Sequence, residues 1–534
     1  MKKLITGNAG ILPASIANRI LALQNLCIIL FILLLTLFIA GCTSPTNQIH
    51  VTGITLDQAS ISLEIGEQTS LTARVDPTNA TNQKLVWSSS DETIAVVDAN
   101  GKVSALGNGQ AIISVSTTDG RFRASSNAFI ADYIYEIDSA EQWHRAIEEI
   151  KNYGDNRSYL IHIMADFELS GLGENEFTFG DVISINMIIY GNHTISLSSI
   201  GSLLRIGHRQ NVTIRDIVLE GIEYNEKYPL VDIIGEDAVF SMWGDATVQN
   251  NSGAGVWVQD FARFILKDNS KILNNVAGIA LGENSTFYME DNALINNNGE
   301  RAVSMSRYSA FYMSGGVISG HNFTSKREGC SGVQISGTFI MSGGLITDNE
   351  THTTGGAVFV GYDGTFILDG GSINGNIRDA VHVSRNGSFT MLSGEISNNT
   401  GSGVELKQSS VFTMQDGVIS DNAISGVLIF SGNFNMLGGS ISGNTGYQGG
   451  GVFIHGGSSE ISFLMSGGVI YGSETSGVPA DLANVSRDIG AALYVHNIDD
   501  VLLQYGDGTD ILPHIDGFEY YTDYTIEGRS VIDR

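Results

Sequence analysis

Charged side chains gather in one short stretch of the sequence, IRDAVHVSRNG at residues 377–387, which contains Arg378, Asp379, His382 and Arg385. An imidazole and a carboxylate are the groups that proteins use for proton transfer, and guanidinium groups bind anions. Strand periodicity directs His382 outward from AVHV, with Arg385 in the following turn. These four residues are the best candidate for a charged site on a strand wall. The alternative is that they are ordinary surface charges.

Other acidic residues offer weaker candidates. The pair Asp499 and Asp500 lies at the end of a repetitive region, where a solvated turn explains it. Asp507, Asp510 and Asp516 could offer oxygens to calcium, but their spacing matches neither the EF-hand loop nor the GGxGxD repeat. We therefore predict no metal site, no cofactor and no assigned catalytic residue.

Much of the chain consists of repeats of one sequence motif. Residues 339–349 read FIMSGGLITDN, and close variants return at intervals of 22 to 29 residues, with the Phe at positions 240, 264, 287, 311, 339, 366, 389, 412, 434 and 463. Each unit has a second strand-like word about sixteen residues after its Phe. A unit of this length with short β words fits one coil of a parallel β-helix.

Period-2 geometry turns the Phe and Met of F-x-M inward, so identical side chains stack from coil to coil. The Gly pair that often follows permits a tight turn. An Asn recurs ten residues after the Phe, where it can adopt left-handed geometry and join an amide ladder. The expected ladder members are Asn250, Asn274, Asn297, Asn349, Asn376, Asn399, Asn422 and Asn444, with Asn322 one residue late.

The middle residue of F-x-M faces outward and forms a row along the coils. Its members in five consecutive coils are Ile265, Tyr288, Tyr312, Ile340 and Ile367, which we call the interaction stripe. A contiguous apolar row often marks a binding site. Two alternatives remain open: such residues simply suit strands, or a loop covers the row.

The array resembles the right-handed parallel β-helix, or pectate-lyase-like, superfamily over residues 159–505, and especially the Gly/Asn-rich repeats of bacterial surface proteins. The preceding segment, 132–158, contains an amphipathic helix expected to cap the first coil, and 506–534 is irregular. Many enzymes of the superfamily cut acidic polysaccharides. Their Gly-His-Gly, Arg-Ile-Lys and R-x-P-x-x-R words are absent, and no Pro occurs between residues 230 and 478.

Residues 51–131 alternate apolar and polar positions between turn signals about every ten residues, which predicts an antiparallel sandwich. The segment closely resembles the bacterial Ig-like group 2 family. That resemblance implies a spacer or adhesive module. We expect Trp87 in the core of the sandwich; the alternative is an aromatic residue that binds a ligand. The residues that carry it are Leu71-Thr72-Ala73, Pro77, Trp87-Ser88-Ser89, Ala95-Val96-Val97, Gly101-Lys102-Val103 and Gly109-Gln110-Ala111.

The N-terminal residues 1–41 have the features of an export signal: basic residues, an apolar run and the small-residue stop Ile39-Ala40-Gly41 before Cys42. This ending resembles the lipobox of bacterial lipoproteins, which implies that Cys42 carries a lipid and that 42–50 is a tether. The alternative is an uncleaved anchor. Thr43, where an Asp is missing, favours the outer membrane and cell surface, and Cys330 would be the single remaining thiol.

Acidic residues outnumber basic ones 57 to 28, for a net charge of −29. Such a chain repels phosphate backbones, so nucleic acid is excluded as a partner. The expected membrane contact is therefore the lipid on Cys42.

The predicted fold class is all-β: a small Ig-like sandwich followed by a right-handed parallel β-helix with an N-terminal capping helix. The predicted function is a lipid-anchored protein of the bacterial envelope that binds a glycan or protein ligand without catalysis. The alternative is a divergent polysaccharide lyase or glycoside hydrolase.

Overall fold

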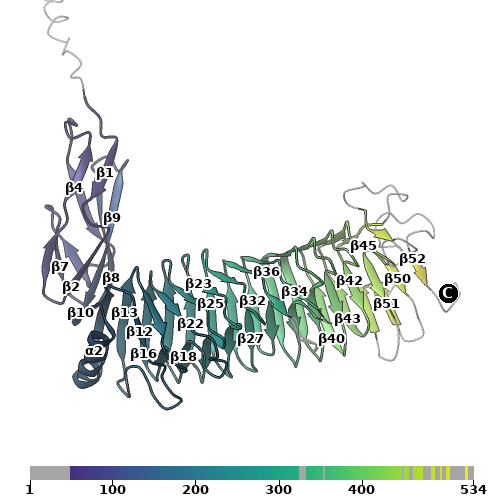
Figure 1. Ribbon diagram of the computed structural model, residues 1–534. Coiled ribbons are helices and arrows are strands. Elements are labelled where there is room, and N and C mark those ends of the chain that lie inside the picture. Colours follow the sequence, from purple (N-terminus) through teal and green to yellow (C-terminus); the bar gives the residue numbers. More distant parts are fainter. Residues whose placement is uncertain are drawn as a thin grey trace, which may run out of the picture. The chain divides into compact units, whose positions relative to one another are not determined.

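The computed structural model describes residues 48–323, 332–352, 355–447, 449–455, 461–472, 483–486, 493–495, 501–505 and 524–526 (Figure 1). Several predicted features lie outside these ranges: the predicted signal segment 1–41, Cys42, Cys330, the pair Asp499 and Asp500, and Asp507, Asp510 and Asp516. The chain forms two compact units, divided close to residue 128. Among the described residues, no helix is both long and apolar enough to pass through a bilayer.

The first unit is an antiparallel β structure, as predicted. Its sheets have the orders β1-β4, β2-β9-β8-β5 and β3-β7-β6. Leu71, Ala95 and Val103 are buried in its core, whereas Trp87 is only partly buried. The strands are β1 (Gly53–Leu56), β2 (Ser60–Glu64), β3 (Gln68–Ser70), β4 (Ala73–Asp76), β5 (Leu85–Ser89), β6 (Ala95–Val97), β7 (Lys102–Ala105), β8 (Gly109–Thr117) and β9 (Arg123–Ala131).

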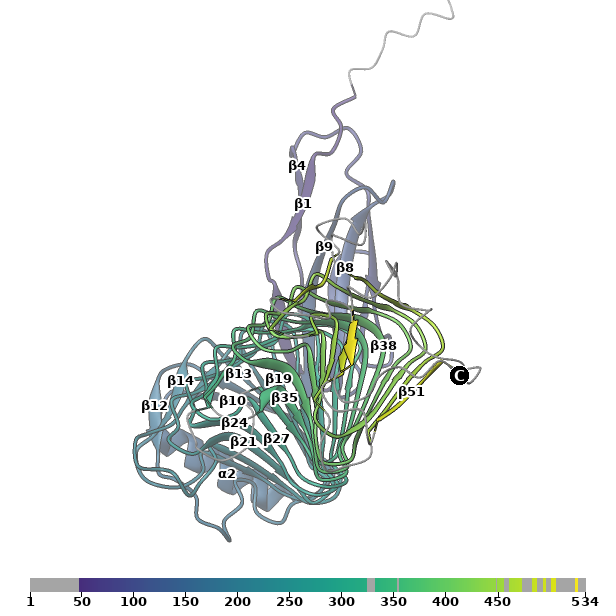
Figure 2. The same ribbon diagram turned by 90° about the vertical axis from the view of Figure 1, so that its right-hand side faces the viewer.

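The second unit is a parallel β-solenoid built from three ladders of strands; its coils are seen nearly end-on in Figure 2. The first ladder contains the F-x-M strands. It comprises β10 (Tyr133–Ile137), β11 (Ser158–Ile163), β13 (Ile185–Gly191), β16 (Gln210–Arg215), β19 (Val239–Trp243), β22 (Arg263–Leu266), β25 (Thr286–Met289), β28 (Ala310–Met313), β32 (Thr338–Met341), β36 (Thr365–Asn374), β38 (Ser388–Ser397), β40 (Ser410–Met414), β43 (Gly432–Met436), β47 (Ile461–Met465) and β51 (Val501–Tyr505).

The second ladder follows the Gly corner of each coil and joins the first in one 26-stranded sheet. The long strands β36 and β38 pass through that corner and belong to both ladders. Its separate strands are β12 (Phe167–Leu169), β14 (Thr194–Leu197), β17 (Val218–Glu220), β20 (Thr247–Gln249), β23 (Lys271–Leu273), β26 (Leu294–Asn296), β29 (Val317–Ser319), β33 (Leu345–Thr347), β41 (Val418–Ser420), β44 (Ser440–Ser442) and β48 (Val469–Ile470).

The third ladder is a separate 13-stranded sheet. Two short pairs, β30 (Asn322–Phe323) with β34 (Glu350–Thr351) and β45 (Thr445–Gly446) with β49 (Val485–Ser486), extend individual coils. The strands of the third ladder are β15 (Leu204–Ile206), β18 (Val231–Ile234), β21 (Ala254–Gln259), β24 (Ala277–Leu281), β27 (Val303–Met305), β31 (Val333–Ile335), β35 (Gly356–Val360), β37 (Asp379–Val383), β39 (Val404–Leu406), β42 (Val427–Ile429), β46 (Val452–Ile454), β50 (Leu493–Val495) and β52 (Tyr524–Ile526).

The core consists of the predicted inward rows. From Phe240 to Phe463, each Phe of the repeat is fully buried and stacks on the next with ring centroids 4.5 to 5.6 Å apart. The Gly corner is tight because a Met side chain packs against it. A Cβ at Gly439, whose φ is +81°, would lie 2.5 Å from the Met414 Cε atom.

A buried amide ladder runs along the inside of one turn of the solenoid. In its regular part, the Asn399 Nδ2 and backbone N–H groups both donate to Asn422 Oδ1, at 2.8 and 3.1 Å. The Asn399 Nδ2 also lies 3.2 Å from the Ile373 carbonyl oxygen. The ladder members are Asn225, Asn251, Asn275, Asn298, His321, Asn349, Asn376, Asn399, Asn422, Asn444 and Asn484.

The predicted ladder is therefore correct for five positions, from Asn349 to Asn444, and shifted by one residue for the others. Asn250, Asn274 and Asn297 are exposed residues with φ between 52° and 58° that precede the buried amide. We predicted that one Asn would both adopt left-handed geometry and form the amide hydrogen bonds. In these coils, two consecutive residues divide these roles: the first is left-handed and the second forms the hydrogen bonds. In the fourth clear coil, His321 occupies the ladder position instead of Asn322.

His321 fits the ladder only as a neutral imidazole. Its Nδ1 lies 2.9 Å from Asn349 Oδ1, an acceptor, and its Nε2 lies 3.1 Å from Asn298 Nδ2, a donor. Nδ1 therefore carries the proton and Nε2 accepts. Burial lowers the pKa of His321 to about 4, against the opposing effect of the Asn349 hydrogen bond.

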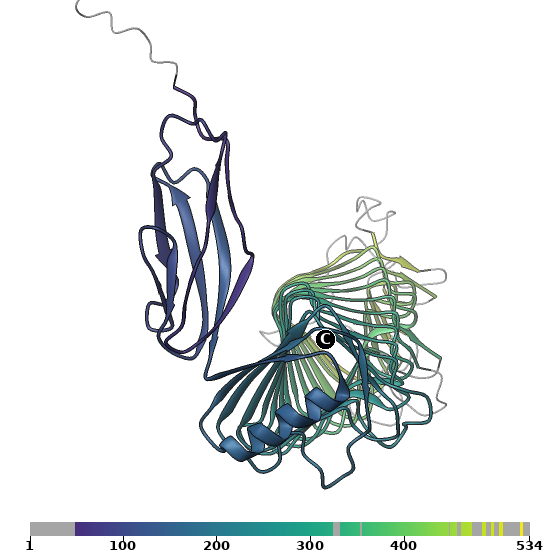
Figure 3. The ribbon, with the colours of Figure 1, turned by 60° about the vertical axis from the view of Figure 1, so that its left-hand side comes forward.

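Helix α2 (Ala140–Tyr153) lies across the first coils, as predicted (Figure 3). Trp143, Ile147 and Ile150 are buried in the solenoid core. Solenoid strands also occur in segments expected to lack them. Strand β10 precedes the helix, in the segment 132–158, and β52 lies beyond residue 505.

Asn399→Ala should reduce the free energy of unfolding by about 2 to 4 kcal/mol, because it leaves the buried Asn376 backbone N–H without its acceptor and also removes the hydrogen bonds that Asn399 Nδ2 donates. Urea unfolding measures this change. The control is Asn398→Gly, an exposed neighbour whose φ of 56° glycine tolerates. If both variants unfold like the wild type, the amide ladder does not stabilise the solenoid.

His321→Asn should remove one source of acid sensitivity. The folded pKa of His321 is below its unfolded value near 6.5, so its contribution to stability is complete above pH 6.5 and is lost as pH falls towards about 4. At pH 5 the wild type should therefore lose about 2 kcal/mol more than the variant, relative to pH 7.5. Equal losses measured by urea unfolding would show that His321 is protonated in the folded state.

Candidate functional site

Two of the four predicted charged residues meet in one cluster on the third ladder. Asp379 and His382 lie on β37, and the register places His382 beside Glu405 on β39. The His382 Nδ1 lies 2.5 Å from Glu405 Oε2, and Lys407 Nζ lies 2.8 Å from Glu405 Oε1. We call Asp379, His382, Glu405 and Lys407 the charged cluster.

The charged cluster is largely shielded from solvent. His382 does face outward from the solenoid core, as the alternation predicted, but it is 0% exposed and Glu405 is 6% exposed. The Phe359 ring, 1% exposed, stacks on the imidazole at 5.3 Å. His382 therefore belongs to the outer wall of the coil but is enclosed by its neighbours. Asp379 keeps part of its surface exposed.

Burial and neighbouring charges shift the two carboxylates in opposite directions. Burial raises the pKa of Asp379, and the negative charge of Glu405 acts in the same direction. Burial alone would raise the pKa of Glu405, but the hydrogen bonds and charges of His382 and Lys407 lower it below the usual range. At neutral pH, Glu405 is ionised, whereas Asp379 titrates near neutrality.

The two arginines do not join the charged cluster. Arg378 is exposed with a φ of 90°, and its backbone N–H donates to Thr400 Oγ1 at 2.9 Å. The Arg385 guanidinium lies over the Tyr362 ring, 4.4 Å from its centre.

Glu405 and Lys407 were missed because they lie one coil away, in the word GVELKQ. The available signal was the coil spacing: Glu405 is the middle residue of the strand that follows AVHV by 23 positions. Aligning the outward residues of consecutive coils, as for the interaction stripe, pairs His382 with Glu405.

A second buried ion pair lies earlier on the same ladder. The Arg205 Nε donates to Asp232 Oδ2 at 2.9 Å, both side chains are 7% exposed, and Gln259 Nε2 donates to Asp232 Oδ1. The Arg205 Nη1 donates to the Gly173 carbonyl oxygen at 2.7 Å. Burial raises the pKa of Asp232 despite these partners. Each carboxylate oxygen already has a donor, so this pair connects coils rather than binding a ligand.

The interaction stripe lies on the first ladder in unbroken register across β22, β25, β28, β32 and β36. Tyr312 is 39% exposed and the other four members are partly exposed. The rings of Tyr288 and Tyr312 stack 5.2 Å apart with planes 14° from parallel. The row then becomes polar at Thr390 and Thr413.

Two hollows are less promising. One, of about 380 Å³, lies over exposed turn residues that include Asn250, Asn274, Val276 and Asn297. Its amides already bond to neighbours: Asn297 Nδ2 donates to Asn274 Oδ1 at 2.7 Å, and Asn250 Nδ2 donates to Glu220 Oε1 at 2.9 Å. Its two buried lining amides, Asn251 and Asn275, are members of the amide ladder and are already hydrogen-bonded there.

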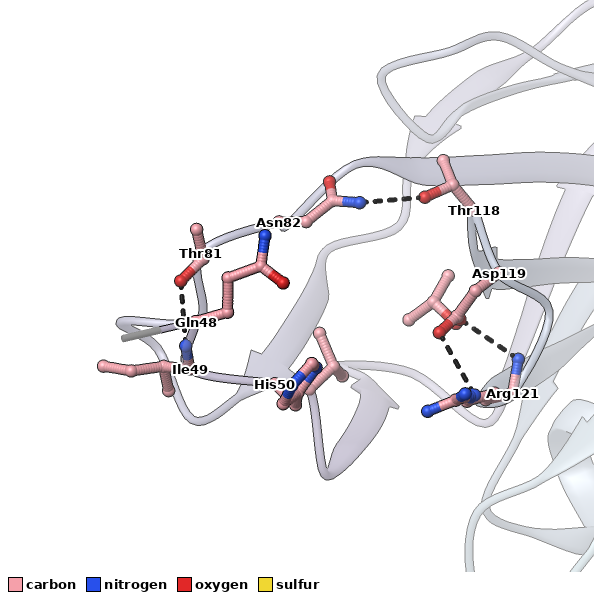
Figure 4. Close-up of a pocket in the computed structure, with 10 residues that line it drawn as sticks. Gln48, Ile49, His50, Thr81, Asn82, Thr118, Asp119 and Arg121 are labelled. Atoms are coloured by element: carbon pink, nitrogen blue, oxygen red, sulfur yellow. Dashed lines mark hydrogen bonds and ion pairs between the residues drawn. The ribbon is translucent and has the colours of Figure 1, made fainter. Parts of the chain in front are cut away.

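The other hollow, of about 190 Å³, lies in the Ig-like unit beside Gln48, Ile49 and His50 (Figure 4). Its Asp119 and Arg121 form an exposed ion pair at 3.5 Å. The hydrogen bond from the Thr117 hydroxyl lowers the pKa of Asp119. These groups are satisfied by their own turn, so the hollow shows no constellation for chemistry.

Comparison with known families agrees with this architecture. Residues 50–127 match the bacterial Ig-like domain of group 2, and residues 255–465 match the right handed beta helix region. The chain thus carries an Ig-like module followed by a right-handed parallel β-helix, which confirms the fold predicted from the sequence.

Relatives share only short segments with this chain. They include an uncharacterized protein of Clostridium acetobutylicum (41% identical over 80 residues, 15% of this chain and 8% of that protein) and the minor capsid protein of Enterobacteria phage T3 (48% over 69 residues, 13% and 16%). The kappa-carrageenase of Pseudoalteromonas carrageenovora is 36% identical over 77 residues, 14% and 19%. The chain spans less than a fifth of each of these proteins.

A solved structure, the A-module of the mannuronan C-5 epimerase AlgE6 from Azotobacter vinelandii, aligns with 68% of this chain and 94% of its own. The sequence identity is 13% and the TM-score is 0.34, so this likeness carries no argument about function.

Proposed function

We propose that this chain is a lipid-anchored protein of the bacterial cell surface whose β-helix binds a protein partner through the interaction stripe. The observation that carries the proposal is the unbroken register of Ile265, Tyr288, Tyr312, Ile340 and Ile367, all of which keep solvent-exposed surface. At the spacing of adjacent strands the stripe is about 20 Å long.

The rigidity of the wall favours binding. Each stripe residue is held by a strand that is hydrogen-bonded to strands on both sides, so a partner orders few new side chains when it docks. An apolar row of this kind is larger than the single surface hydrophobics of ordinary soluble proteins.

The tyrosine geometry favours a protein over a sugar chain. Because Tyr288 and Tyr312 stack on each other, one face of each ring is covered. Sugar rings stack on open aromatic faces, whereas protein interfaces combine aromatic edges with aliphatic side chains such as Ile340. A glycan ligand is therefore the weaker candidate.

The burial of the charged cluster argues against the alternative of a polysaccharide lyase or hydrolase. A general acid or base must come within about 3 Å of the substrate, and neither His382 nor Glu405 offers an accessible surface. Incubation with acidic glycans, with and without calcium, tests this alternative directly. Chain cleavage that depends on Glu405 would overturn the binding proposal.

Placement at the cell surface rests on the lipobox-like residues before Cys42 and on the Ig-like module, which suits a spacer. The acidic surface leaves the lipid as the expected link to the membrane, since anionic headgroups repel a chain with a net charge of −29.

The combined variant Tyr288→Thr, Tyr312→Thr and Ile340→Thr should bind a matrix-protein array at least about tenfold more weakly than the wild type, with a nearly unchanged melting temperature. The control is Thr390→Ser with Thr413→Ser, in the polar part of the same row. Loss of folding in the triple variant would mean that the stripe is covered. Binding of the wild type to a glycan array alone would reject a protein partner.

Cys42→Ala should abolish labelling by a radioactive fatty acid and leave the longer precursor, because the thiol that accepts the lipid is gone. Labelling and gel mobility in the producing cell measure this. A variant that is still labelled and processed normally would contradict lipid anchoring, whereas Cys330→Ala should behave like the wild type.

A further inference from the structure

We propose that Asp379, His382 and Glu405 bind one divalent transition-metal ion, with Zn²⁺ as the best fit, and that this ion connects two consecutive coils of the β-helix. Within the described part of the chain, this is the one group of three such residues whose ligand atoms all lie within 4.8 Å of one another. The proposal is independent of the interaction stripe, which lies on another ladder.

The ligands come from adjacent strands that are already in register. His382 on β37 and Glu405 on β39 are direct partners, and Asp379 begins β37. A Zn²⁺ ion holds nitrogen and oxygen ligands at about 2.0 to 2.2 Å in tetrahedral geometry, so neighbouring ligand atoms lie about 3.4 Å apart. The His382 Nδ1 and Glu405 Oε2 atoms, now at 2.5 Å, need only a small side-chain rotation to reach that separation.

Surrounding groups hold the carboxylates and the imidazole in place, as outer ligands do in metal sites. The Ser402 backbone N–H donates to Asp379 Oδ1 at 2.7 Å, and Lys407 Nζ lies 2.8 Å from Glu405 Oε1. The Phe359 ring stacks on His382. Each carboxylate thus has one oxygen fixed by the protein and a second oxygen that can turn to an ion.

A glycine allows the Asp379 carboxylate to approach the next coil. A Cβ atom at Gly401 would lie 2.6 Å from Asp379 Oδ1 and 2.4 Å from its backbone nitrogen. Such a contact is far below the normal separation of these atoms. Any larger residue at position 401 would displace the carboxylate, so the local backbone is matched to this side chain.

The donor set selects the kind of ion. One imidazole nitrogen with two carboxylate oxygens suits Zn²⁺ and related first-row ions, whereas Ca²⁺ and Mg²⁺ require mostly oxygen ligands in larger number. Asp379 retains exposed surface through which an ion can enter, and the burial of His382 and Glu405 favours a structural ion over one that meets a substrate.

The positive charge of Lys407 weakens binding of a cation at this site, which provides a second test of the proposal. Its ammonium lies against Glu405 and 4.9 Å from the centre of the Phe430 ring, so it adds a positive charge close to the site. Lys407→Met preserves most of the side-chain volume and removes that charge. This variant should bind the ion more tightly than the wild type.

The test uses the full chain, purified with a chelator and titrated with Zn²⁺ alone by calorimetry at pH 7.5. The expected result is one ion per chain, a melting temperature raised by several degrees, and a visible Co²⁺ spectrum of a site with nitrogen and oxygen ligands. Ca²⁺ at the same concentration should not compete.

His382→Gln and Glu405→Gln should each weaken Zn²⁺ binding at least about tenfold. The matched control is His193→Gln, which alters a partly exposed imidazole 3.2 Å from Asp166 and should bind Zn²⁺ like the wild type. No ion bound by the folded wild type, or binding that falls equally in the control, would overturn the proposal. If one cluster variant does not fold, the other and Lys407→Met still decide it.

Discussion

The in-register stacking of coils is the constraint on which the second unit depends, and the buried amide ladder enforces it. A strand slipped by one residue would turn its core side chains outward. It would also leave the amides of residues such as Asn376 and Asn399 buried without partners, which costs far more than an exposed mismatch. The coils vary in length from 22 to 29 residues, yet the Phe row and the amide row stay aligned because the extra residues lie outside these two positions.

Register also determines what the outer walls offer. Every coil places its outward residue beside that of the next coil, so outward residues of similar chemistry form rows along the wall. Tyr288 and Tyr312 belong to an apolar row, and His382 and Glu405 belong to a charged one. The first row is accessible and suits a docking surface. The second row is enclosed, so its charges must satisfy one another or hold an ion. The proposed surface function and the proposed metal ion thus arise from the same stacking.

The sequence predicts much of this fold because the repeat encodes it directly. Phe366 is buried, Tyr312 faces outward and α2 caps the first coils, as periodicity indicated. In the early coils the predicted ladder position is one residue too early. Sequence alone does not distinguish the left-handed Asn274 from Asn275, which forms the hydrogen bonds. His321 was missed since it is not an amide, although its two nitrogens reproduce the amide's donor and acceptor.

The charged site was harder to predict for a different reason. Alternation assigns a face to His382 but says nothing of its exposure, which depends on neighbours such as Phe359 that lie far away in the sequence. The same limit applies to Trp87, which is only partly buried although we expect it in the core from the sequence. Contacts between segments distant in sequence, rather than local pattern, decide these positions.

The central claim, that buried amides hold the coils in register, is tested most directly by hydrogen exchange of single backbone amides in the folded protein. The account predicts that the N–H groups of Asn376, Asn399 and Asn422, each bonded to the next amide oxygen at 3.0 to 3.1 Å, are among the slowest to exchange. Exchange of these groups as fast as that of amides open to solvent, without a hydrogen bond, would contradict it.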